Sequence, residues 1–73
     1  MPIPDQYAPP DGQETITSDD GVSQYWVDDA RYIYARHREL ERDGRTGPYR
    51  QWQPTHYRLG KKRTLADWVE GKA

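Results

Sequence analysis

Between residues 19 and 43, five apolar side chains and one histidine recur at the spacing of an α-helix. The recurring positions, separated by 4, 4, 3, 4 and 3 residues, are Val22, Trp26, Ala30, Ile33, His37 and Leu40. Positions three or four residues apart lie on the same face of an α-helix. Asp19 suits the positive N-terminal end of such a helix, and Gly44 is a natural residue to follow its last turn. The pattern therefore predicts an amphipathic helix over residues 18–43.

A β-hairpin is the competing prediction for the first part of this stretch. Asp20-Gly21 is a turn signal, and residues 25–27 have side chains that favour strands. Residues 15–17 and 22–27 would then be the two strands. The helix is favoured because the helical spacing continues without a break to Leu40.

The first seventeen residues have a composition that suits neither a helix nor a central strand. They contain four of the six prolines, together with the acidic residues Asp5, Asp11 and Glu14. Proline fixes φ and has no backbone N–H to donate, so it favours extended chain. Residues 1–17 are predicted to be an extended, proline-rich, acidic arm, which needs a surface of this molecule or of another to lie on.

The remainder of the chain divides into an irregular segment and a short helix. Glycine and proline interrupt the basic, aromatic-rich residues 44–63 too often for a helix. Thr64 and Asp67 have the spacing of a capping box, which predicts a short C-terminal helix within 64–73. The predicted fold class is mainly α, small and irregular, in a single small domain with one long amphipathic helix, one short helix and the arm.

Composition indicates that any core is thin. The chain has 73 residues and no cysteine, and its valines, isoleucines and leucines number only nine. A chain of this length is marginally stable without a disulfide, a metal or a partner, and the absence of cysteine removes the first of these. The residues predicted to form the core are Trp26, Ile33, Leu40, Leu59, Leu65, Trp68 and Val69.

The two halves of the chain have opposite charge. Residues 1–30 hold seven acidic residues and no lysine or arginine, whereas residues 31–63 hold ten basic residues against three acidic ones. Such asymmetry indicates self-association or an oriented contact with a charged partner. The alternative is that the acidic arm folds back and neutralises the basic part of its own molecule.

The segment 44–63 holds the residues predicted to contact a partner. It combines basic side chains with aromatic rings and contains no acid, and tryptophan, tyrosine and arginine are enriched at protein–protein hot spots. Trp52 has no apolar neighbours at a regular spacing, so we expect a partner to cover its ring. The predicted partner-binding residues are Trp52, Arg50, Tyr49, Tyr57 and Arg58.

Nucleic acid is the alternative target of this segment. Basic side chains can contact backbone phosphates while aromatic rings stack on bases. The predicted phosphate contacts are Lys61, Lys62, Arg63 and Arg45. The sequence pI of about 6.0 argues against this alternative, because nucleic-acid-binding domains are usually strongly basic.

Several other classes are not expected. His37 and Glu41 could share a helix face, but two ligands do not make a metal site, and the only other histidine is His56. No phosphate-binding loop, calcium loop or catalytic constellation is evident, so neither an enzyme nor a cofactor is expected. No apolar run is long enough to span a membrane, and residues 1–5 have no positive or apolar region, so neither a membrane span nor a signal peptide is expected.

The sequence therefore predicts a non-enzymatic, protein-binding accessory protein. It would be stabilised by its partner, another protein or a second copy, and could be a structural or cementing subunit of a larger assembly, such as that of a phage. The alternative is a small nucleic-acid-binding regulator that uses residues 44–63. The expected location is the cytoplasm, or the virion if the assembly is viral.

Overall fold

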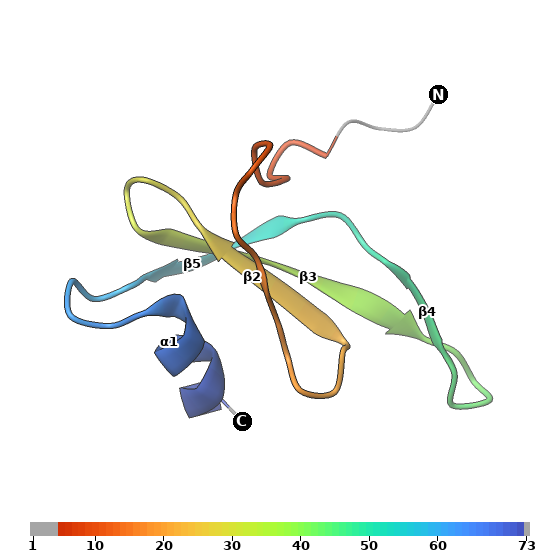
Figure 1. The fold of residues 1–73 in the computed structure, drawn as a ribbon. Coiled ribbons are helices and arrows are strands. Elements are labelled where there is room, and N and C mark those ends of the chain that lie inside the picture. The colour runs from red at the N-terminus through yellow and green to blue at the C-terminus, as the bar shows by residue number, and fades with distance from the viewer. Residues whose placement is uncertain (1–4, 73) are drawn as a thin grey trace.

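The protein is an antiparallel sheet with one short helix, and the prediction of a mainly α fold is wrong. The structure, a computed structural model, describes the backbone of residues 5–72. Within them the elements are β1 (Ile16–Thr17), β2 (Ser23–Val27), β3 (Tyr32–Leu40), β4 (Thr46–Tyr49), β5 (Gln53–Arg58) and α1 (Leu65–Lys72) (Figure 1). The predicted long helix is replaced by β2, β3 and the turns around them.

Strand β3 is the centre of a twisted, curled sheet. β1 pairs with β2, and β2 pairs with β3 along its whole length, from Ser23 opposite His37 to Val27 opposite Ile33. On the other edge of β3, β5 pairs with the first half of the strand and β4 with the second half. All pairings are antiparallel, so turns rather than helices join the strands β1 to β4.

Three turns of one kind produce this meander. In each, the N–H of the fourth residue donates to the carbonyl of the first, at 2.9, 3.0 and 3.0 Å, and the fourth residue has a positive φ of 72°, 71° and 86°. A type I turn followed by a left-handed residue is a common hairpin connection. The three turns are Ser18–Gly21, Asp28–Arg31 and Glu41–Gly44.

The helical stripe fails because its members lie on opposite faces of the sheet. Trp26 is paired with Tyr34 on one face, whereas Ile33 is paired with Val27 on the other. Side chains alternate between the two faces of a strand, and here both faces are covered, so apolar residues occur at odd and even positions alike. The hairpin considered for the first part of this stretch is present as β1 and β2.

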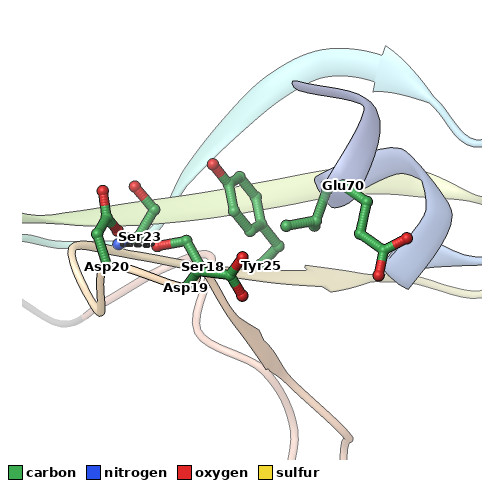
Figure 2. A pocket seen from close by; sticks show the side chains of 7 residues that line it. Ser18, Asp19, Asp20, Ser23, Tyr25 and Glu70 are labelled. Carbon is green, nitrogen blue, oxygen red and sulfur yellow. Dashed lines mark hydrogen bonds between the residues drawn. The ribbon is translucent and has the colours of Figure 1, made fainter. Parts of the chain in front are cut away.

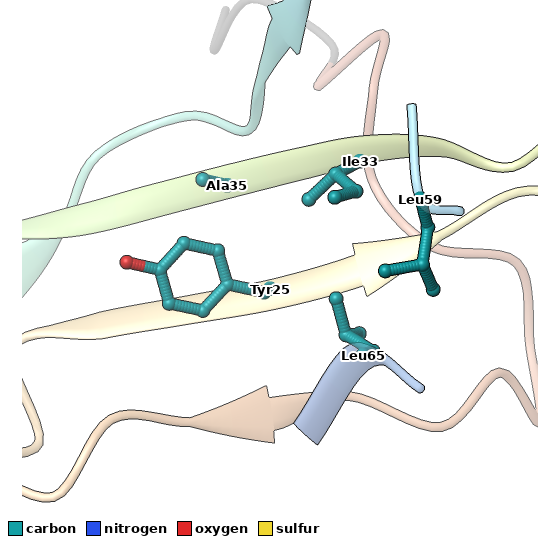
Figure 3. Packing of buried hydrophobic residues seen from close by; sticks show 5 residues of the cluster. All are labelled: Tyr25, Ile33, Ala35, Leu59 and Leu65. Atoms are coloured by element: carbon teal, nitrogen blue, oxygen red, sulfur yellow. The ribbon is translucent and has the colours of Figure 1, made fainter. Parts of the chain in front are cut away.

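One face of the sheet packs against α1 and carries the hydrophobic core. Ile33 is completely buried in a cluster with Tyr25, Ala35, Leu59 and Leu65 (Figure 3). Trp68 and Val69 of the helix pack against this cluster, and the ring of Trp68 meets that of Tyr25 edge-on at 5.5 Å. Of the residues predicted to form the core, Leu40 is the exception, because it is 71% exposed at the end of β3.

The opposite face is covered by the N-terminal arm. Tyr34 lies between two rings, with centroids 4.7 Å from Trp26 and 5.8 Å from Tyr7. The Trp26 indole N–H donates to the carbonyl of Tyr7 at 3.0 Å. The Tyr34 hydroxyl donates to the Asp28 carboxylate at 2.8 Å, which raises the pKa of Tyr34. In Figure 1 the arm and α1 lie on opposite sides of the sheet.

The described part of the arm, residues 5–15, is without regular structure, and residues 16 and 17 form β1. Residues 1–4 of the predicted arm lie outside the described residues. The arm is attached by stacking and hydrogen bonds: the backbone N–H of Trp52 donates to both carboxylate oxygens of Asp5 at 3.2 Å. Among the described residues no ion pair joins the arm to a basic side chain, so the arm does not neutralise the basic residues by direct pairing.

Candidate functional site

Trp52 is an internal residue, and the expectation that a partner covers its ring is wrong. Its side chain is only 4% exposed. The Arg36 guanidinium lies 4.9 Å from the centre of the Trp52 ring and 4.3 Å from that of Tyr49. Arg36 is itself held by Gln24, whose side-chain oxygen accepts from Nε at 2.7 Å. The indole is therefore covered by residues of its own molecule.

Tyr49 and Arg50 also have partners within the molecule. The Tyr49 hydroxyl donates to the carbonyl of Gly21 at 2.9 Å, which ties β4 to the β1–β2 turn. The Arg50 side chain forms an exposed ion pair with Glu39 at 3.4 Å. The partly buried contact gives Tyr49 a structural role, whereas Arg50 is exposed and its predicted partner contact stays a prediction.

Tyr57 and Arg58, at the end of β5, are exposed as predicted contact residues should be. Tyr57 is 60% exposed, and its ring lies 6.2 Å from that of Trp68. The Arg58 guanidinium lies 5.2 Å above the ring of Tyr32, which is 43% exposed. The structure thus places Tyr32 and Arg58 together on one face of the sheet where β5 ends, and Tyr57 next to α1 on the other face.

The predicted phosphate contacts form two separate groups. Lys61, Lys62 and Arg63 are consecutive and exposed in the turn that joins β5 to α1. Arg45 lies in the β3–β4 turn, where it pairs with Asp43 at 3.2 Å. Figure 1 shows these two turns at opposite ends of the sheet, so Arg45 and the Lys61–Arg63 turn cannot contact one short ligand together.

Arg31 holds the basic turn in place, and sequence reasoning did not identify this role. Its Nη2 donates to the carbonyls of Gly60 at 2.6 Å and Arg63 at 3.0 Å, and its Nε to that of Leu59 at 3.4 Å. Its own carbonyl accepts from the N–H of Leu59 at 2.7 Å. The guanidinium reaches these carbonyls from a left-handed backbone position that arginine rarely adopts.

A groove of about 500 Å³ lies beside the basic turn, and we call it the basic groove. Its floor is aliphatic and is contributed by Ile16 of β1, Val27 of β2, Leu65 of α1 and Leu59, the residue after β5. Leu59 and Leu65 belong also to the core, so the floor continues the packed interior (Figure 3).

The rim of the basic groove is strongly cationic. Arg31, Lys61, Lys62 and Arg63 line it, and among the described residues Glu14 is the only acidic side chain that does, so the described lining has a net charge of +3. No ion pair within residues 5–72 involves any of the four cations. The N-terminus of α1 adds little to this charge, because Thr64 and Asp67 cap it reciprocally, at 3.2 and 3.5 Å.

A second, smaller hollow of about 280 Å³ is acidic. The β1–β2 turn contributes Asp19 and Asp20 to its lining, and α1 contributes Glu70 (Figure 2). Asp20 is already engaged, because its carboxylate accepts from the Ser18 hydroxyl at 2.6 Å and from the Val22 N–H at 3.0 Å. These bonds lower the pKa of Asp20. Across the described part of the chain, no group of three or more acidic, histidine or cysteine side chains could hold a metal ion.

Strand pairing brings together one serine and one histidine. The Ser23 hydroxyl lies 2.7 Å from Nδ1 of His37, its cross-strand neighbour. A serine nucleophile needs a base that a third group orients, and the other contact shown for His37 is the edge of the Tyr25 ring at 6.5 Å. The pair therefore gives no basis for assigning a reaction.

Comparison with known proteins identified no relative: the chain matches no family model, no curated protein and no solved structure. None of the helices in the described residues is long and apolar enough to cross a membrane.

Proposed function

We propose that this chain is a non-enzymatic protein-binding module, and that it contacts its partner with the end of the sheet where β5 leads into the basic turn. The observation that carries this proposal is that Tyr32, Tyr57 and Arg58 are all exposed where β5 ends, Tyr32 and Arg58 stacked on one face and Tyr57 beside α1 on the other. Large aromatic side chains next to arginine are typical of the residues that dominate protein–protein affinity.

The small core supports the same proposal. Only seven hydrophobic residues are buried within the described chain, and four large hydrophobic side chains, Tyr7, Tyr32, Leu40 and Tyr57, remain exposed. A partner that covers some of these side chains would add apolar burial that the chain cannot supply alone. This is the behaviour expected of a structural or cementing subunit in a larger assembly, located in the cytoplasm or in a virion.

Photocrosslinking tests the proposal at the surface concerned. A photoreactive phenylalanine in place of Tyr57 should give a discrete protein adduct in a lysate of the source organism. The same group in place of Arg42, an exposed residue in the β3–β4 turn, serves as the control and should not. Equal labelling from both positions, or no protein adduct at all, would contradict the proposed function.

Nucleic acid is retained as the second candidate because Lys61, Lys62 and Arg63 are consecutive, exposed and unpaired with acids in residues 5–72. Because Arg45 lies away from this turn, only three of the four predicted phosphate contacts are close together. Binding that depends on phosphates weakens steeply as salt rises. Titration of single-stranded and duplex DNA at two salt concentrations measures this, and absence of binding at low salt removes the candidate.

A further inference from the structure

We propose that the basic groove binds an acidic peptide segment of the partner, with one large apolar side chain of that segment seated on the aliphatic floor. This inference rests on the proposed protein-binding function and names the chemistry of the partner. The groove lies next to the exposed group, since Leu59 of its floor directly follows Arg58.

The floor determines what kind of side chain can enter. Ile16, Val27, Leu59 and Leu65 offer branched aliphatic surface, and no aromatic ring of residues 5–71 lines the groove. Nucleic-acid bases bind proteins mainly by stacking on aromatic rings, so this floor fits an aliphatic or aromatic peptide side chain better than a base. A volume of about 500 Å³ is ample for one such side chain and part of its backbone.

The rim determines the charge of the segment. Four cations surround the floor and face a single acid, Glu14, and none of the four is neutralised by an ion pair in the described residues. An approaching segment that carries aspartate or glutamate on both sides of its apolar residue would meet cations on the rim. Electrostatic complementarity of this kind selects the partner and speeds its approach.

The rim is also held in a defined shape before binding. Arg31 donates to three carbonyls of residues 59–63, and the N–H of Arg63 donates to the carbonyl of Gly60 at 3.0 Å, so the turn is closed by its own bonds. A preformed site loses less conformational freedom on binding than a flexible loop would. The cations at 61–63 therefore project from a fixed turn.

Selection from a displayed library of random twelve-residue peptides tests the inference with the whole chain as target. The enriched peptides should combine several acidic residues with at least one large apolar residue. Their affinity, measured by fluorescence anisotropy, should fall at least tenfold in the double variant Lys61→Glu, Lys62→Glu. It should be unchanged in the matched control Arg42→Glu, Arg45→Glu, which alters the same charge at the opposite end of the sheet.

A second variant tests the floor without changing the charge of the rim. Ala66 is exposed and lines the groove, so Ala66→Trp fills the space and should also weaken binding at least tenfold. Ala8→Trp, at an exposed position of the arm, is the control and should bind as the wild type does. Near-ultraviolet circular dichroism of each variant verifies that the fold is retained.

The outcomes separate this inference from the function on which it rests. Enriched peptides that lack acidic residues, or that bind all variants equally, overturn the groove assignment and leave protein binding in place. Self-association of the wild type that Lys61→Glu, Lys62→Glu abolishes overturns it in favour of a second copy as occupant. Failure to enrich any peptide overturns the inference, and only if the crosslink at position 57 also fails does the proposed function fall with it.

Discussion

Arg31 shows how one residue can connect two distant segments of a small protein. It occupies the left-handed position of the β2–β3 turn, where Gly21 and Gly44 stand in the other two turns. A positive φ costs an arginine about 1 kcal/mol or more relative to glycine. The three carbonyls that its guanidinium binds account for the choice of arginine over glycine here.

Two substitutions of Arg31 separate the cost of the backbone strain from the contribution of the guanidinium hydrogen bonds. Arg31→Ala keeps the backbone strain and loses the hydrogen bonds, so it should lower the free energy of unfolding by about 1–2 kcal/mol. This value is smaller than three buried hydrogen bonds would give, because the groups are partly exposed to water. Arg31→Gly also loses the hydrogen bonds but relieves the strain, and it should be about 1 kcal/mol more stable than Arg31→Ala. Urea denaturation measures both. An Arg31→Ala variant as stable as the wild type would show that the guanidinium contacts contribute nothing.

Trp52 and Tyr57 should respond to truncation in opposite ways. Trp52 is buried, so Trp52→Ala should cost about 3–5 kcal/mol and unfold much of the population. Tyr57 is exposed, so Tyr57→Ala should change stability by no more than about 0.5 kcal/mol. Thermal unfolding followed by circular dichroism compares the two. Equal loss of stability in both variants would contradict the burial described here.

Asp20 should make part of the stability depend on pH. Hydrogen bonds from Ser18 and Val22 favour its charged form and lower its pKa in the folded state. A group with a lowered folded pKa stabilises the fold above its unfolded pKa, and that contribution is lost as the pH falls through the folded value. Between pH 5 and pH 2, the free energy of unfolding should therefore fall less in Asp20→Asn than in the wild type. Identical pH profiles would exclude this role.

At the scale of elements, the left-handed residues of the turns are the determinants of the meander. A Cβ added at Gly44 would meet no atom within 4 Å, but its φ of 86° is unfavourable for any other residue. Gly44→Ala should therefore cost about 1 kcal/mol through backbone strain alone. Gly60→Ala is the control, because Gly60 shows no positive φ and its added Cβ would make only ordinary contacts with Arg63. Chemical denaturation should find Gly60→Ala near neutral, and equal costs would refute the assignment.

The left-handed turn residues also explain why the sequence predicts some of the strands and the helix correctly and others wrongly. A glycine in the left-handed conformation ends a helix and also closes a hairpin turn, so Gly44 fits both readings. The helical spacing from Val22 to Leu40 is fortuitous, because both faces of β2 and β3 carry apolar or aromatic side chains. Only the hairpin at Asp20-Gly21 and the capped helix after Thr64 have local signals strong enough to identify them.

The candidate site was predictable to a similar extent. Tyr57, Arg58 and the basic residues 61–63 were identified from composition, and the structure places them on the surface around one end of the sheet. The Trp52 ring is covered by Arg36, 16 residues away in the sequence, and the Trp52 backbone is bound by Asp5, 47 residues away, and no local pattern reports such contacts. The role of Arg31 likewise depends on a turn 28 or more residues distant.

At the scale of the whole molecule, the basic groove lies near Val27 at the end of β2, and the acidic hollow lies near Ser23 at its start. The groove combines the net positive rim with a floor that continues the core, and the arm covers the opposite face of the sheet. A partner segment in the groove would contact Gln13 and Glu14 of the arm and leave the Tyr7 contact with the opposite face in place. Under the proposed function, the partner contacts the molecule at the end of the sheet where β5 leads into the basic turn.

The most direct test of this account is a nitrogen-15 NMR titration of the chain with an acidic, leucine-containing peptide. The account predicts that amide shifts change around residues 14–16, 27, 31 and 59–66, which surround the basic groove, and hardly at all in the arm at 5–10 or around Trp52. Shifts centred on the arm and Trp52, or no shifts at millimolar peptide, would contradict it.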